Sequence, residues 1–138
     1  MAQSYIKYRS GYKYQLVESY EVEVSITSEE DIETDYIDLS TTGWLTIKIG
    51  YAWDGPSGPT IDTKNFMRGS LVHDALYQLM RNEHIEQKCR AHADEELKKI
   101  CLEDGMSRLR AWYVHRAVQR GAGSAASPES RKKVHRAP

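Results

Sequence analysis

The spacing of apolar residues changes halfway along the chain, and this change restricts the fold. Two stretches alternate apolar with polar residues, with the apolar positions at Val22, Val24, Ile26 and at Leu45, Ile47, Ile49. Such alternation is typical of strands that bury one face. From about residue 65 the apolar residues recur at three- and four-residue intervals, which is typical of helices. Strands followed by helices favour an α+β fold over alternating β–α units.

We therefore expect one antiparallel sheet, built from the first fifty residues, packed against three C-terminal helices. Two of the expected strands flank Ser10-Gly11 as a hairpin. The expected strands lie at residues 5–8, 12–16, 22–26, 35–39 and 45–49. The expected helices lie at about residues 65–81, 86–103 and 107–120. Asn65 is the expected N-cap of the first helix, and Gly105 suits the position just after the second.

A chain of 138 residues is long enough for one domain with a single core. We expect residues 1–121 to form that α+β domain, with Trp112 and Tyr113 of the third helix in its core. From Ala122 onward the composition shifts to small residues and then to the basic run 131–133. Low hydrophobicity and clustered charge indicate a flexible basic tail over residues 122–138.

The formal net charge of −1 predicts neither membrane contact nor a nucleic-acid partner. No stretch approaches the ~20 apolar residues that span a bilayer, and the first residues lack the apolar core of a secretory signal. Cys89 and Cys101 lie on one expected helix, roughly 18 Å apart, which is too far for a disulfide. Reduced cysteines favour assembly in a cytoplasm.

His73 and Asp74 stand inside the apolar helical stretch 71–77. Burying a carboxylate without a partner costs several kcal/mol, so these side chains must meet a metal ion, a substrate or other polar groups. Tyr77 shares a helix face with His73, because the two residues are four apart. Asp94 lies beside the apolar stripe of the second helix and is expected to point toward the first.

A loop rich in glycine and proline precedes the helices, at residues 50–59, and it carries Asp54 and Ser57. The sequence therefore predicts a polar cluster where this loop meets the first two helices. Its members are Asp54, Ser57, His73, Asp74, Tyr77 and Asp94.

Four interpretations of this cluster remain open. The first is a divalent-metal site with His73, Asp74 and Asp94 as ligands, a donor set that suits zinc, manganese or iron. The second is a metal-free hydrolase with Ser57 as nucleophile, His73 as base and Asp94 as orienting group. The third is a structural clasp of hydrogen bonds that ties the loop to both helices. The fourth is a ligand-binding pocket without chemistry.

Four motifs resemble a family of unknown function that is found mainly in tailed bacteriophages and prophages. They match its D-G-x-S-x-P loop, its H-D-x-L-Y helix, its A-D helix start and its closing Y-x-A-V-R-x-x-G helix. The corresponding segments are residues 54–59, 73–77, 93–94 and 113–121, and the resemblance spans about residues 43–121. The chain departs from the pattern at Trp53, where a threonine is usual, and at His115 and Gln119.

The resemblance implies a phage origin and either a cell-wall-active hydrolase or a component of the virion. We expect a metal-dependent hydrolase that acts on peptidoglycan, with zinc as the favoured metal. His73, Asp74 and Asp94 would hold the metal, Asp54 would act as base or fourth ligand, and Tyr77 would stabilise an oxyanion.

The alternative implied by the resemblance is a non-catalytic virion or assembly protein of the tail or capsid, in which the cluster is structural. Expected partners are other phage structural proteins, the bacterial cell wall or further copies of the chain. The expected location is the virion or the host cytoplasm. A third hypothesis is a factor that binds and inhibits a host protein.

Overall fold

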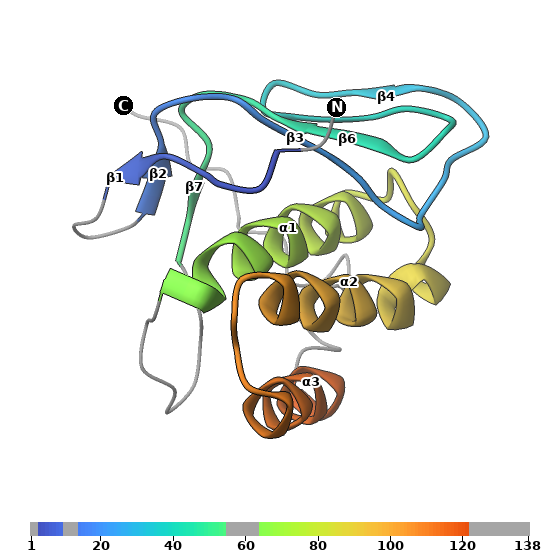
Figure 1. The fold of residues 1–138 in the computed structure, drawn as a ribbon. Helices are drawn as coiled ribbons and strands as arrows, with labels where there is room; N and C mark the ends of the chain where they lie inside the picture. The colour runs from blue at the N-terminus through green and yellow to red at the C-terminus, as the bar shows by residue number, and fades with distance from the viewer. Residues whose placement is uncertain (1–2, 10–13, 55–63, 122–138) are drawn as a thin grey trace, which may run out of the picture.

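Two antiparallel sheets from the N-terminal half and three α-helices from the C-terminal half make up the described part of the fold (Figure 1). The computed structural model describes residues 3–9, 14–54 and 64–121. The predicted α+β class is confirmed. The predicted tail, residues 122–138, lies outside the described residues. No helix among the described residues is long and apolar enough to cross a bilayer.

The strands form two sheets where the sequence predicted one. The first sheet has the order β1-β2-β7, with β1 at Tyr8–Arg9, β2 at Tyr14–Leu16 and β7 at Ala52–Trp53. The second has the order β3-β6-β5-β4, with β3 at Tyr20–Glu23, β4 at Ile32–Glu33, β5 at Ile37–Leu39 and β6 at Trp44–Ile47.

The chain leaves the second sheet at Gly50 and joins the first. Gly50 has a φ of +94°, a conformation that favours glycine, so the chain turns after β6. The Gly50 amide donates to the Leu16 carbonyl, and the Leu16 amide donates to the Tyr51 carbonyl, so β7 is aligned with β2. β1 pairs antiparallel with β2, as the predicted hairpin requires, although residues 10–13 of its turn lie outside the described residues.

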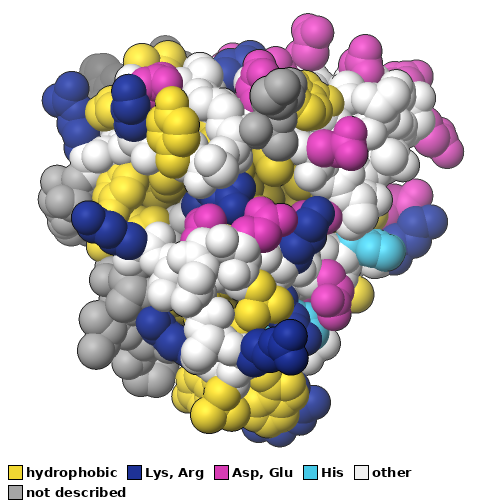
Figure 2. Space-filling model, viewed as in Figure 1, with side chains coloured by type: hydrophobic (Ala, Val, Ile, Leu, Met, Phe, Trp, Pro, Cys, Tyr) yellow, Lys and Arg dark blue, Asp and Glu magenta, His cyan; other side chains and the backbone are white. Residues whose placement is uncertain are grey.

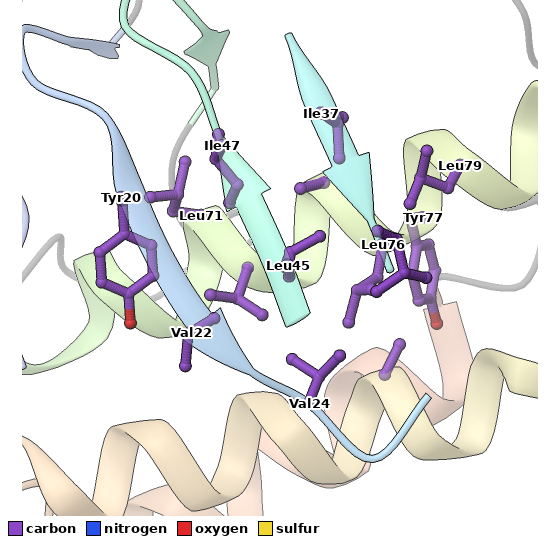
Figure 3. Close-up of a cluster of buried hydrophobic side chains, with 14 of the residues drawn as sticks. Tyr20, Val22, Val24, Ile37, Leu45, Ile47, Leu71, Leu76, Tyr77 and Leu79 are labelled. Atoms are coloured by element: carbon purple, nitrogen blue, oxygen red, sulfur yellow. The ribbon is translucent and has the colours of Figure 1, made fainter. Parts of the chain in front are cut away.

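Helix α1, Lys64–Arg81, lies between the sheets and helix α2 (Figure 1). Asn65 lies inside α1 and is not its N-cap, a shift of the kind common at helix ends. Most of the apolar positions predicted for the sheet are buried in the core that the sheet shares with this helix, where Leu45 and Ile47 lie opposite Leu71 (Figure 3). The prediction is wrong for Ile49, which lies beyond the end of β6 and is 60% exposed. A helix buried around most of its circumference can hold polar groups only where they find partners.

Helix α2, Arg90–Glu103, follows a short 3₁₀ helix, η1, at Gln87–Cys89, and is followed by α3, Arg108–Gly121. The predicted role of Gly105 is confirmed, because this residue has a φ of +96° just after the α2 C-cap. Its amide donates to the Leu102 carbonyl, and the Met106 amide donates to the Cys101 carbonyl. These two bonds form a Schellman motif and fix the turn into α3.

Close packing of α1 on α2 depends on Gly69. A Cβ at this position would lie 2.9 Å from Cys101 Sγ and 2.9 Å from Leu97 Cδ1, both of which are fully buried. Helix propensity alone would make alanine more stable than glycine by about 1 kcal/mol. We expect Gly69→Ala instead to lower the free energy of unfolding by about 1 kcal/mol, because the overpacking cost exceeds that gain.

Urea denaturation of both proteins would measure this effect. Ala117→Gly, at an exposed position inside α3, would give the size of the propensity effect in the same protein. A Gly69→Ala variant more stable than the parent would contradict the close approach of the two helices.

Candidate functional site

His73 and Asp94 meet across the contact between α1 and α2. His73 Nε2 lies 2.7 Å from Asp94 Oδ1, and both side chains are buried. α1 brings His73 to this contact because the residue lies on the face that packs against α2. The prediction that Asp94 points toward the first helix is therefore confirmed.

Tyr77 joins the same contact from the next turn of α1. Its hydroxyl donates to Asp94 Oδ1 over 2.7 Å, and its ring centroid lies 4.1 Å from that of His73. One buried carboxylate oxygen thus accepts hydrogen bonds from two side chains. Hydrogen bonds to an ionised group are about twice as strong as neutral ones, which compensates for burying the Asp94 charge.

Asp74 lies on the other side of the imidazole. Its Oδ1 is 4.0 Å from His73 Nδ1, beyond direct hydrogen-bond distance. The side chain of Asp74 is 36% exposed, whereas that of Asp94 is 2% exposed. The two carboxylates therefore flank opposite ring nitrogens, with Asp94 fully buried and Asp74 only partly buried.

The carboxylates control the protonation of His73. Burial acts to lower the pKa of the imidazole, but the hydrogen bond to Asp94 and the negative charges of Asp74 and Asp94 outweigh it, and the pKa is raised above 6.5. Burial raises the pKa of Asp74, His73 and the positive charge of Arg81 oppose that rise, and the nearby charge of Asp54 adds to it. Asp54 directly follows β7, so the first sheet carries this carboxylate toward α1.

Arg90 is a member of the site that the sequence analysis missed. Burial and the bond to Asp94 raise the pKa of Tyr77, and the Arg90 guanidinium acts in the opposite direction. Arg90 is the first residue of α2 and stands four residues before Asp94, so both project from one face. The four-residue spacing between Arg90 and Asp94 is the feature of the sequence that could have identified Arg90 as part of the site.

Ser57 lies among residues 55–63, outside the described residues, so the nucleophile prediction for this residue stays a prediction. Among the described residues, no group of three or more His, Cys, Asp and Glu side chains is arranged to hold a metal ion. Metal ligation by His73, Asp74 and Asp94 also stays a prediction.

A second polar cluster, also missed from the sequence, surrounds the buried Arg68 of α1. Each kind of guanidinium nitrogen has a partner in this cluster. Arg68 Nε and Nη2 donate to both oxygens of Asp104, at 3.0 and 2.9 Å, and Nη2 also donates to Glu103. Nη1 donates to the Tyr20 hydroxyl and to the Gln3 carbonyl. This cluster ties α1 to β3 and to the end of α2, and its saturated bonds indicate a structural role.

The raised pKa of His73 predicts how stability depends on pH. The folded protein binds the His73 proton more tightly than the unfolded chain does, so protonation stabilises the fold. This stabilisation is fully present below the unfolded pKa of 6.5 and is lost as the pH rises through the pKa of the folded state. The difference in unfolding free energy between the parent and His73→Gln should therefore shrink as the pH rises above 6.5. Chemical denaturation across this range would measure it, and a constant difference would exclude a raised pKa.

Removal of the Tyr77 hydroxyl tests the second bond to Asp94. Tyr77→Phe should lower the unfolding free energy by about 1.5 kcal/mol, at the low end for bonds to charged groups, because His73 still bonds the same oxygen. Tyr113→Phe, on the exposed side of α3, should change stability by less than about 0.5 kcal/mol. Equal effects of the two substitutions would argue against the Tyr77–Asp94 bond.

No protein-family model, curated protein or solved structure matches this chain. The phage family therefore stays a prediction that rests on the four motifs.

Proposed function

We propose that this chain is a metal-dependent hydrolase of phage origin in which His73 is the general base. The observation that carries the proposal is the 2.7 Å bond between His73 Nε2 and the buried Asp94, with Nδ1 turned toward the partly exposed Asp74. A buried histidine held at one nitrogen and directed toward the surface at the other is suited to moving a proton.

Asp94 determines which nitrogen of His73 carries the proton. A hydrogen bond to a carboxylate requires the proton on Nε2, so the lone pair of the neutral ring is on Nδ1. When Nδ1 takes a proton from a water molecule, the ring becomes positive, and Asp94 stabilises that charge at 2.7 Å. Tyr77 holds the carboxylate in place through the same oxygen. In this scheme Asp94 and Tyr77 are positioning residues.

Asp74 and Asp54 are the proposed ligands of a divalent cation. The charge of Asp54 raises the pKa of Asp74, so the two carboxylates lie near each other, and the positive charge of Arg81 acts on Asp74 in the opposite direction, so a cation bound there would compete with Arg81. Oxygen donors suit Ca²⁺, Mg²⁺ or Mn²⁺ better than zinc, whereas the zinc expected from the sequence requires His73 as a ligand. A cation bound there would supply charge stabilisation for an oxyanion. The roles of His73 and Asp94 thus differ from those expected of metal ligands.

The substrate class follows from the phage resemblance, which implies a peptidoglycan bond. The test uses the full chain after treatment with a chelator, mixed with purified peptidoglycan and with Ca²⁺, Mg²⁺, Mn²⁺ or Zn²⁺ in turn. We expect release of soluble fragments that depends on one of these cations. A parallel assay with a p-nitrophenyl ester separates a wrong substrate from a wrong reaction. Absence of hydrolysis of both substrates with all four cations would overturn the proposal.

The second candidate is a non-catalytic virion or assembly protein. The observation in its favour is that Asp94 accepts bonds from both His73 and Tyr77, so the contact already serves as a clasp between α1 and α2. In this case His73→Ala, which removes the bond to Asp94, lowers the melting temperature, and a phage particle that carries this variant stays infectious once folded. Loss of infectivity by a stably folded His73→Gln protein would exclude the clasp as the sole role.

A further inference from the structure

Helix α3 has an apolar face on each side, and one of them is exposed. The inner face packs on α2 through Ala111 and Val114. On the outer face Leu109 is 77% exposed, Trp112 53% and Tyr113 51%. Residues three and four apart share a helix face, so these three form one stripe. The prediction that Trp112 and Tyr113 lie in the core is wrong, because α2 covers only the opposite side of the helix.

The outer stripe is surrounded by positive charge. Arg108, Arg116 and Arg120 are exposed, and the Arg116 guanidinium carbon lies 5.9 Å from the centre of the Trp112 ring. α3 contains no acidic residue. Figure 2 shows hydrophobic and basic side chains next to each other at the α3 end of the molecule. The stripe thus combines aromatic, aliphatic and cationic side chains.

The charge of the whole chain is divided between two regions. Residues 105–138 contain eight Lys and Arg side chains and one acidic side chain, Glu129. Residues 1–104 contain eleven basic and nineteen acidic side chains. The net charge of −1, from which we predicted no membrane contact, averages these two regions. Such asymmetry is typical of chains whose basic part meets an anionic surface.

We propose that the outer face of α3 binds the surface of an anionic lipid bilayer. A helix that lies in the bilayer interface presents Trp and Leu to the lipid, with Lys and Arg beside them for the anionic head groups. Tyrosine and tryptophan prefer this interface because each has an apolar body and a polar tip. Surface binding of this kind requires no membrane-spanning helix, and it is independent of the hydrolase proposed above.

The test is co-sedimentation of the full chain with phosphatidylglycerol vesicles and with phosphatidylcholine vesicles. We expect binding to the first that weakens as salt rises, and at least tenfold weaker binding to the second. Leu109→Asp and Trp112→Asp should each weaken binding to phosphatidylglycerol at least tenfold. Ile49→Asp is the matched control, because Ile49 is a 60% exposed apolar residue outside α3, and it should leave binding unchanged.

Circular dichroism would first establish that each variant is folded. The proposal is overturned if the parent fails to bind phosphatidylglycerol vesicles. It is also overturned if the α3 variants bind as well as the parent, since the basic residues alone would then account for the binding. If the protein does not bind vesicles but forms a dimer that Leu109→Asp dissociates, the outer face of α3 is a dimer interface instead. If it does not bind vesicles but binds duplex DNA, that face is a DNA-binding surface instead.

Discussion

In the proposed hydrolase, replacing His73 with glutamine is expected to slow hydrolysis by about 10²–10⁴-fold, the usual contribution of a general base. Glutamine can still hydrogen-bond to Asp94, so the contact between α1 and α2 is retained while the titratable nitrogen is lost. The rate of fragment release from peptidoglycan, or of p-nitrophenyl ester cleavage, would measure this loss.

His115→Gln is the matched control for this substitution. His115 is also buried and also lies near a carboxylate, with its Nε2 3.2 Å from Glu95, but Glu95 is largely exposed and the pair lies between α2 and α3. This variant should retain the parent's rate. Equal activity of the His73→Gln protein and the parent would refute the role of His73, even if hydrolysis itself is observed.

Replacing Arg68 with methionine is expected to lower the free energy of unfolding by about 3 kcal/mol, the low end of the range for breaking a buried ion pair. The low end applies because Asp104 and Glu103 retain 18% and 49% side-chain exposure and regain water when the guanidinium is lost. Tyr20 and the Gln3 carbonyl lose a donor in the same step. Methionine keeps the apolar stem, so the loss reports the polar contacts.

Lys7→Met provides the comparison for Arg68. Lys7 forms an ion pair with Glu18 at 2.9 Å, but both side chains are about half exposed, and such a pair contributes about 0–1 kcal/mol. Urea denaturation of both variants at one pH gives the contrast directly. Similar losses for the two substitutions would mean that the Arg68 cluster is far more hydrated than its burial indicates.

The hydrolase and the clasp share one contact and differ in the use of a single atom. Both require the bond between His73 Nε2 and Asp94. Only the hydrolase requires His73 Nδ1, which faces Asp74 at 4.0 Å. Stability measurements on His73→Ala therefore report the shared contact, whereas the rate of hydrolysis by His73→Gln reports the second nitrogen.

Local sequence was sufficient where a short segment determines its own structure. The change of apolar spacing determined that strands precede helices, because burial of one face requires a period of two in a strand and about 3.6 in a helix. Gly105 marked the end of α2, because a left-handed conformation favours glycine. Polar residues inside an apolar helix, such as His73, had to meet partners, and the helical position of Asp94 indicated one.

Only the tertiary structure decided which distant groups meet and which surfaces stay open. The split into two sheets depends on pairing between β2 and β7, which are far apart in the chain. Arg68 finds partners that include Gln3 and Asp104, and no local pattern encodes separations of 65 and 36 residues. Likewise, the sequence of α3 supports an apolar face on either side of the helix, and the position of α2 determined which face was buried and which was left to solvent.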